Sequence, residues 1–154
     1  DTGRERFMEF SADSWQIVMD ERAISKRIIE FARCVDEKDF AGYANTFAVD
    51  GELVTPWGGH SGREGLAEHV RAGLERYFAT QHVSANHEIT VVGDRATARS
   101  TLFATHVRNE EGTDFWTTGG HYELELVREE GVWRFSRISQ HPAWRFDTRA
   151  AARG

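Results

Sequence analysis

Hydrophobic residues recur every three to four positions in the first part of the chain, which is the period of an amphipathic helix. The pattern starts at Glu21, and residues 1–20 before it are expected to form an irregular or helical arm. Its apolar positions are Ile24, Ile28, Phe31, Ala32 and Val35. A second, short helix is predicted from Asp39. Its apolar face holds Phe40, Tyr43, Ala44 and Phe47.

The pattern is interrupted between residues 50 and 62. Asp50-Gly51 is a turn signal, residues 52–55 are typical of a short strand, and residues 56–62 read as a glycine-rich loop. Ser61 is expected to cap a third helix, because Glu64 stands three residues further on in capping-box order. The residues assigned to that helix are Leu66, His69, Val70, Leu74 and Phe78.

After Thr80 the period changes to two and β-branched residues become frequent, which indicates strands. The predicted strands cover residues 82–92, 95–108, 115–128 and 132–141, and residues 147–154 are expected to be a frayed tail. Short turns between consecutive strands predict an antiparallel meander, and helices followed by strands predict an α+β fold. Without an internal repeat or a linker, we expect one domain over residues 1–154, with its core at about 20–146.

Charge and cysteine content narrow the function. The chain of 154 residues has 25 acidic and 19 basic residues and a net charge of −6, which argues against nucleic acid and anionic membranes as partners. No apolar run approaches the roughly 20 residues needed to span a bilayer. The single Cys34 cannot form an internal disulfide and is interpreted as core filler, so a reduced, cytoplasmic setting is expected.

Five short segments in a fixed order resemble the NTF2-like superfamily and, within it, the SnoaL-like and scytalone-dehydratase-like group. The segments are Ala32–Phe40, Phe47–Gly51, Gly62–Leu66, Thr80–Val83 and Gly131–Phe135, and the resemblance covers roughly residues 20–146. It implies an NTF2-like cone, in which a curved mixed or antiparallel sheet packs on about three N-terminal helices and encloses a pocket. Proteins of this shape carry out many functions, so the function must come from the residues inside the cone.

The same resemblance implies catalytic roles at three positions. Asp36 falls at the aspartate that orients a histidine, and His82 and His106 fall at the two catalytic histidines. Strict alternation puts His106 on a small, mostly apolar face of its strand, as a pocket wall would be. That face also holds Ala96, Ala98, Ser100, Leu102 and Ala104. For His82, the alternation leaves open which face of the strand looks into the cone.

The sequence also departs from the scytalone dehydratase pattern. Val35 and, approximately, Thr55 stand where two pocket tyrosines are expected, while Gly120 and Tyr122 replace a later serine and asparagine. The resemblance therefore supports acid–base chemistry better than one particular substrate. The residues expected to contact a ligand are Tyr43, Thr55, Trp57, Trp116 and Tyr122.

The histidine spacing does not predict a metal site. No two histidines stand at i, i+4 with a glutamate between them, and His82 and His87, five apart on a strand, are expected on opposite faces. We therefore expect no metal and no organic cofactor. The remaining histidines are interpreted as structural or surface residues; they are His60, His69, His87, His121 and His141.

Two functional classes stay open. The first is a cofactor-independent acid–base enzyme of the dehydratase, isomerase or cyclase type, acting as a homodimer on a small hydrophobic, polyketide-like or aromatic metabolite. The second is a non-catalytic small-ligand-binding protein or a partner subunit similar to a dioxygenase β chain. For each of the three residues a role without function also stays open: Asp36 as a solvated carboxylate or turn residue, His82 as a strand-edge histidine bonded to backbone, and His106 as an exposed histidine.

Overall fold

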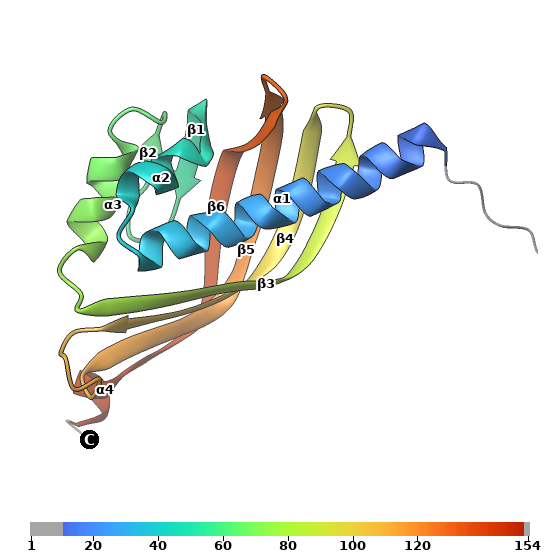
Figure 1. Ribbon diagram of the computed structural model, residues 1–154. Helices are drawn as coiled ribbons and strands as arrows, with labels where there is room; N and C mark the ends of the chain where they lie inside the picture. The colour runs from blue at the N-terminus through green and yellow to red at the C-terminus, as the bar shows by residue number, and fades with distance from the viewer. Residues whose placement is uncertain (1–10, 153–154) are drawn as a thin grey trace, which may run out of the picture.

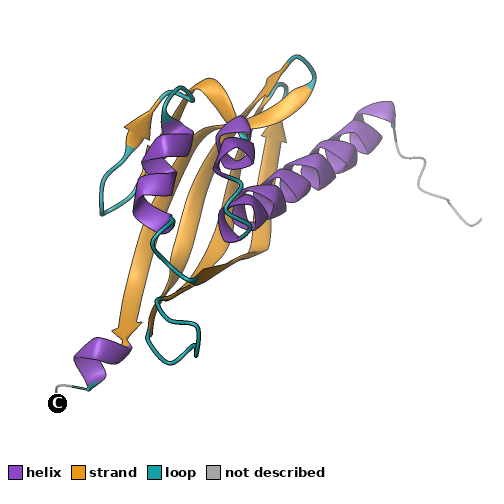
Figure 2. Ribbon diagram, turned by 60° about the vertical axis from the view of Figure 1, so that its left-hand side comes forward, coloured by secondary structure: helices purple, strands orange, loops and turns teal. Residues whose placement is uncertain are grey.

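The computed structural model describes residues 11–152. The first ten residues of the predicted arm and the last two of the predicted tail lie outside the described residues. Figure 1 shows a long helix lying across a strongly curved sheet, with two shorter helices beside it. Figure 2 shows that these helices gather on one face of the sheet, which we call the inner face. No helix within residues 11–152 is both long enough and apolar enough to cross a membrane.

Helix α1 (Ala12–Asp36) begins nine residues before the predicted start, with Ser11 as its N-cap. Its first turns extend past the sheet in Figure 1, and Ile17 and Met19 are exposed there. This part of the helix therefore has no buried apolar stripe, which is why the periodicity of the sequence did not indicate a helix there. Further along, Ile24 and Ile28 are fully buried against the sheet, as predicted.

The next elements differ from the prediction in detail. Helix α2 (Phe40–Asn45) is capped by Asp39, whose carboxylate accepts the Gly42 N–H. Phe47, predicted on this helix, instead begins strand β1 (Phe47–Val54). Asp50-Gly51 is a bulge inside β1 and not a turn, and the strand pairs in parallel with β6 on both sides of it. A Cβ on Gly51 would lie 2.6 Å from the Phe135 carbonyl, so glycine permits this close approach.

The capping box predicted at Ser61 does not form. Ser61 belongs to the short strand β2 (His60–Ser61), and helix α3 (Leu66–Leu74) begins after Gly65. Gly65 adopts a left-handed backbone conformation with φ 76°, and no side chain caps the helix. The start of α3 therefore depends on a backbone conformation that glycine adopts easily, and not on the side-chain cap that the sequence suggested.

Four long strands form the rest of the sheet, and their antiparallel meander is confirmed. They are β3 (Ala79–Val92), β4 (Arg95–Val107), β5 (Phe115–Glu129) and β6 (Val132–Asp147). The full order is β2-β1-β6-β5-β4-β3, and only the β1–β6 pair within this sheet is parallel. β6 continues six residues past its predicted end, because Pro142 sits where the β5–β6 register shifts at Gly119/Gly120.

The expected frayed tail is ordered over its described residues. Helix α4 (Thr148–Ala151) follows β6 directly and is capped by Asp147. Arg149 forms an ion pair with Asp114 at 2.6 Å, which holds α4 against the start of β5. The prediction failed because the stabilising partner lies 35 residues away in the sequence.

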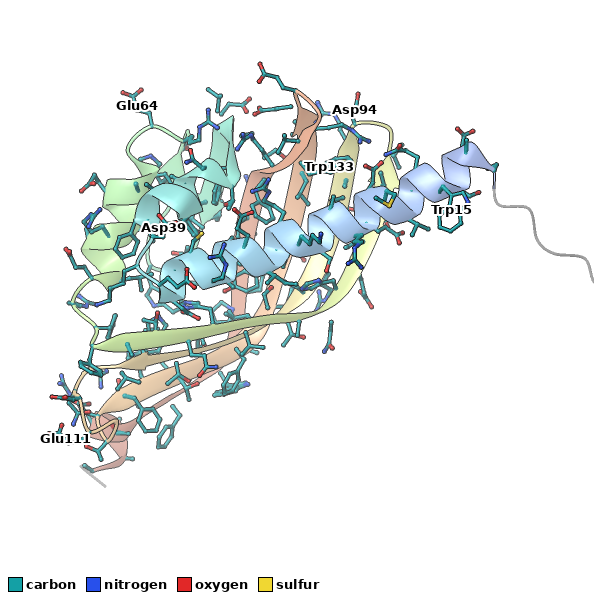
Figure 3. All side chains as sticks on the ribbon, in the orientation of Figure 1. Trp15, Asp39, Glu64, Asp94, Glu111 and Trp133 are labelled. Atoms are coloured by element: carbon teal, nitrogen blue, oxygen red, sulfur yellow. The ribbon has the colours of Figure 1, made fainter. Side chains whose placement is uncertain are left out.

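A buried ion pair fixes α1 to the sheet. Asp20 is 5% exposed, and its two carboxylate oxygens accept hydrogen bonds from Arg128 at 2.7 and 2.8 Å. The indole N–H of Trp133, a residue labelled next to α1 in Figure 3, donates a third hydrogen bond at 3.0 Å. Burial alone would raise the pKa of Asp20, but these hydrogen bonds outweigh it and lower the pKa. The contact fixes α1 along its axis and so positions the far end of the helix.

Candidate active site

A cavity of about 560 Å³ lies between the helices and the inner face of the sheet. Its volume is within the range of small-molecule sites, about 300–1,000 Å³. Helix α1 provides Phe31 and Val35, and the loop after β1 provides Trp57. Helix α3, the segment that follows it and the inner faces of the long strands provide most of the rest of the wall, which is largely aromatic or aliphatic with a few polar groups.

Asp36 and His82 form a hydrogen-bonded pair at this cavity. The Asp36 Oδ1 atom lies 2.7 Å from His82 Nδ1, and Asp36 Oδ2 accepts the backbone N–H of His82 at 2.8 Å. The Thr80 hydroxyl donates to the same carboxylate at 2.9 Å. A carboxylate only accepts hydrogen bonds, so the contact places the ring proton of His82 on Nδ1. The other ring nitrogen, Nε2, has no hydrogen-bond partner within residues 11–152.

The His106 ring lies next to the His82 ring in the cavity wall, with the ring centroids 5.3 Å apart and the ring planes at 82° to each other. It is 5% exposed and stacks on Trp116, with centroids 3.8 Å apart and planes at 3°. Burial lowers the pKa of His106 to about 3, and the nearby side chains of His82 and Arg145 act in the same direction. His106 is therefore a neutral imidazole near pH 7.

The Nδ1 atom of His106 is the one fully buried side-chain nitrogen or oxygen in the described part of the chain that has no hydrogen-bond partner. Such an unpaired group costs about 1–3 kcal/mol. An unpaired buried acceptor is commoner in proteins than an unpaired donor, so we assign the proton of the neutral ring to Nε2. The ring then presents an N–H donor on the side that remains accessible.

The structure brings together all the residues that sequence reasoning assigned to ligand contact. They are Tyr43, Thr55, Trp57, Trp116 and Tyr122, and each lines the cavity. The rings of Trp57 and Trp116 lie 6.2 Å apart. Burial raises the pKa of both Tyr43 and Tyr122, so these two hydroxyls remain protonated.

Sequence reasoning missed several polar residues of the cavity wall, among them Tyr77 and Arg145. Tyr77 is buried, and its hydroxyl accepts the indole N–H of Trp116 at 3.0 Å. The prediction chose Phe78 instead, which is 55% exposed, because α3 ends at Leu74 and the helical face does not continue. Arg145, beyond the predicted end of β6, lies with its guanidinium 4.2 Å from the Trp116 ring centroid. Sequence reasoning would have found Arg145 if the last predicted strand had been extended past Pro142.

The expectation that His82 and His87 point to opposite faces was wrong. A bulge separates Ala85 from Glu88 in the β3–β4 register, with Asn86 at φ 54°. His82 contacts Asp36, and the Nδ1 atom of His87 lies 2.8 Å from the Ser25 hydroxyl, so both face α1. A bulge adds one residue, which reverses the alternation beyond it.

The family is established by a sequence comparison. The SnoaL-like domain family matches residues 16–139 of this chain. None of the curated proteins matches the sequence significantly. The family match runs from the first part of α1 to the middle of β6, and therefore includes both the helix that carries Asp36 and the strands that carry His82 and His106.

Solved structures share the architecture at low identity. A Novosphingobium aromaticivorans protein provisionally named a scytalone dehydratase is 24% identical, with a TM-score of 0.76 over 84% of this chain and 88% of its own. The hexachlorocyclohexane dehydrochlorinase LinA-type3 from Novosphingobium barchaimii is 20% identical, with a TM-score of 0.74 over 84% and 90%. An NTF2-like superfamily protein from Salmonella enterica is 20% identical, with a TM-score of 0.73 over 82% and 94%. These structures show a common fold, which includes that of the NTF2-like protein, and the family match shows that this chain belongs to the SnoaL-like domain family.

Proposed function

We propose that this protein is a cofactor-independent acid–base enzyme that removes a proton from a small hydrophobic, aromatic or polyketide-like substrate. The observation that carries the proposal is the Asp36–His82 pair at a cavity that also holds a second, neutral histidine. Acid–base sites characteristically hold two titratable groups whose different surroundings give one the role of base and the other the role of proton or hydrogen-bond donor.

His82 is the base in this proposal. With its proton on Nδ1, it presents the Nε2 lone pair to the substrate. When it accepts a proton, the imidazolium lies against the Asp36 carboxylate, which stabilises the new charge. A positioned general base contributes about 10²- to 10⁴-fold to a rate.

His106 acts as a neutral hydrogen-bond donor and not as a second base. A group with a pKa of about 3 holds very little proton near pH 7, so it is a poor proton carrier. Its Nε2–H can instead bind the oxygen or other electronegative atom on which negative charge develops. A neutral histidine has this electrophilic role in triosephosphate isomerase, a comparison that rests on chemistry alone.

We favour elimination among the reactions that such a site can perform. His82 takes a proton from carbon, the electron pair of that C–H bond forms a C=C bond, and the leaving group departs with its bonding electrons. The names of two structural neighbours, a scytalone dehydratase and a dehydrochlorinase, both describe eliminations by those proteins. Isomerisation or cyclisation would use the same first step.

The aromatic wall favours a flat substrate. The Trp57 and Trp116 rings form one side of the cavity and the Tyr43 and Tyr122 rings belong to its deeper, buried part. Such side chains provide apolar contact area with a few polar atoms that fix orientation. The cavity volume accommodates one small molecule.

A second copy of this chain is the protein partner that we propose. Four exposed apolar side chains adjoin one another on the outer face of the sheet. This outer-face patch consists of Val83, Phe103, Trp144 and Phe146. Val83 and Phe103 are cross-strand partners, and the Phe103 and Trp144 rings lie 5.9 Å apart. A self-complementary patch without charges suits a two-fold homodimer, and a cytoplasmic setting remains part of the same proposal.

Proton abstraction can be tested before the substrate is known. The protein is incubated in D₂O with a set of hydrophobic ketones and β-substituted aromatic compounds, and mass spectrometry detects deuterium uptake or loss of the leaving group. His82→Ala should abolish both signals, whereas Gln81→Ala, an exposed neighbour on the same strand, should retain them. Ligand binding without any exchange or elimination would instead support the non-catalytic binding protein.

A further inference from the structure

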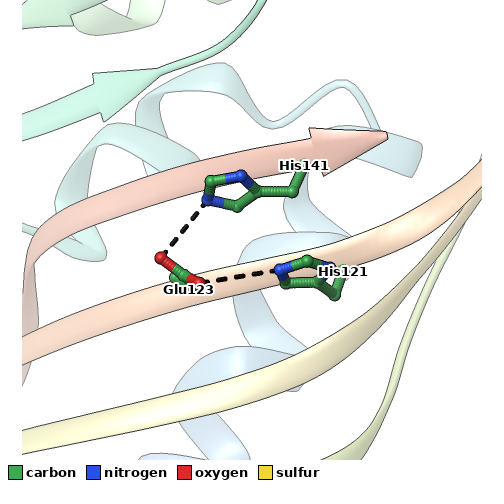
Figure 4. Close-up of side chains that lie close together, drawn as sticks. All are labelled: His121, Glu123 and His141. Atoms are coloured by element: carbon green, nitrogen blue, oxygen red, sulfur yellow. Dashed lines mark ion pairs between the residues drawn. The ribbon is translucent and has the colours of Figure 1, made fainter. Parts of the chain in front are cut away.

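Two histidines and a glutamate converge on the outer face of the sheet, on the opposite side from the cavity. His121 and Glu123 belong to β5, and His141 belongs to β6 (Figure 4). One potential ligand atom from each side chain lies within 4.8 Å of the other two. These residues have no role in the proposed acid–base chemistry.

The β5–β6 register creates this cluster. His121 and His141 are direct cross-strand partners, and their rings stack with centroids 4.8 Å apart and planes at 11°. Glu123 stands two residues after His121 and therefore points to the same face. Its carboxylate lies 3.7 Å from His121 Nε2 and 3.4 Å from His141 Nε2. Figure 4 shows both rings directed at this one carboxylate.

The distances suit a tetrahedral metal ion. Zinc binds imidazole nitrogen and carboxylate oxygen at about 2.0–2.2 Å, so two ligand atoms of one ion are roughly 3.4 Å apart. The two Glu123 separations are close to this value, and the largest adjustment required is a closure of about 1.4 Å by side-chain rotation, from 4.8 Å to about 3.4 Å. Two neutral histidines and one carboxylate are also the ligand set of several zinc sites with an open fourth position.

The surrounding charge leaves the cluster attractive to a cation. Arg99 of β4 is the cross-strand neighbour of Glu123, and Glu88 of β3 is the next residue in the same cross-strand row. This row therefore carries one positive and two negative side chains, which gives it a net negative charge. The side chains are 27% exposed for His121, 45% for His141 and 60% for Glu123, so an ion can enter from solvent.

We propose that His121, Glu123 and His141 bind one Zn²⁺ ion per chain on the outer face of the sheet. The ion links β5 to β6 beside the register shift at Gly119/Gly120. On the opposite face of the sheet from the ion, the side chains of Tyr122 and Gln140 line the cavity. The metal therefore stabilises the part of the wall that carries these two side chains, while a water molecule or a group from another molecule completes its coordination.

Zinc titration of the chelator-treated full-length chain tests this assignment by isothermal calorimetry. We expect about one equivalent per chain with micromolar affinity, and a higher Tm when zinc is bound. Glu123→Gln and His141→Ala should each weaken binding by about tenfold or more. Glu125→Gln is the matched control, because Glu125 lies on the same face of β5 two residues further on and should retain binding.

Acidification supplies a second readout. Histidine ligands must be deprotonated to bind a metal, so zinc affinity should fall as the pH is lowered. The variants are on the surface, and circular dichroism will verify that each one folds. Absence of zinc binding to the wild-type chain, or equal affinity in Glu123→Gln and Glu125→Gln, would overturn the proposal.

Discussion

The Asp36 carboxylate accepts two hydrogen bonds from a single residue, one from the ring of His82 at 2.7 Å and one from its backbone N–H at 2.8 Å. The backbone contact fixes where β3 passes the end of α1, and the ring contact fixes the orientation of the imidazole. Both depend on a carboxylate, because an amide side chain would offer one oxygen and one N–H₂ group. This arrangement leads to the first prediction.

Asp36→Asn should lower kcat by about 10²- to 10⁴-fold once a substrate is found, because the histidine loses its preferred tautomer and the stabilisation of its charged form. The measurement is kcat and KM by steady-state kinetics, with ligand affinity measured separately. Glu37→Gln is the control, since that neighbouring carboxylate is exposed and pairs only with Arg33 at 2.9 Å among the described residues. Unchanged kcat in Asp36→Asn would contradict the role assigned to the pair.

His106 should make the protein less stable in mild acid. Its pKa in the folded state is about 3, whereas an unfolded histidine titrates near about 6.5. The contribution is fully present above pH 6.5 and is lost as the pH falls toward 3, because the unfolded chain then binds the proton more tightly. The slope is about 1.4 kcal/mol per pH unit within this window.

Urea denaturation at several pH values, comparing the wild type with His106→Phe, measures this effect. The phenylalanine keeps an aromatic ring against Trp116 but cannot titrate. We expect the difference in the free energy of unfolding between the two proteins to shift in favour of the variant as the pH falls from 7 to 5. A difference that does not change with pH would refute the assignment of a neutral, buried His106.

Asp20→Asn should destabilise the fold by about 3 kcal/mol, because Arg128 then keeps its charge without its buried partner. Asp94→Asn is the matched control. Asp94 also binds Arg128 at 2.8 Å, but its side chain is 79% exposed, and such surface pairs contribute about 0–1 kcal/mol. Chemical denaturation measures both changes, and comparable losses in the two variants would argue against the proposed anchor.

The acid dependence of the Asp20 contact has a defined direction. The folded-state pKa is lowered, so the contact stabilises the protein above the unfolded value near about 3.9 and the stabilisation is lost as the pH falls below it. The wild type should therefore approach the stability of Asp20→Asn below about pH 4. This pH range is separate from the range in which protonation linked to His106 lowers stability, because the latter begins at about pH 6.5.

Trp144→Glu or Phe103→Glu should convert the proposed homodimer to monomers, because each places a charge in the outer-face patch. Light scattering after size-exclusion chromatography measures the mass. Arg134→Glu provides a control charge change elsewhere on β6, on a side chain that is not part of the patch. A wild-type chain that is monomeric at micromolar concentration would contradict the homodimer proposal.

Sequence reasoning succeeded where a regular period met one continuous surface. Alternation along β4 correctly placed His106 on the buried face, because residues 95–107 run without a bulge and every second side chain packs inward. The helical period likewise identified Ile24 and Ile28 of α1. Asp36 and His82 came from the resemblance, and their hydrogen bond depends on contact between segments 46 residues apart.

Sequence reasoning failed where the backbone interrupts the periodicity of the side chains, or where a contact joins strands that are distant in the sequence. The end of α3 at Leu74 removed Tyr77 from the predicted face, and the extension of β6 beyond Pro142 brought Arg145 to the cavity. The partnership of His121 with His141 depends on the register of two strands, which includes the shift at Gly119/Gly120. Linear spacing contains none of this information.

The bulge at Ala85–Asn86 divides β3 into two parts that serve different purposes. Before it, His82 and Ser84 face the cavity side of the sheet; after it, Ile89 and Val91 pack beneath α1. Each part keeps its own alternation of side chains. Deletion of Asn86 would remove the extra residue and turn the side chains of one part to the opposite face of the sheet, so this residue allows His82 to face the cavity while Ile89, further along the same strand, packs against the core.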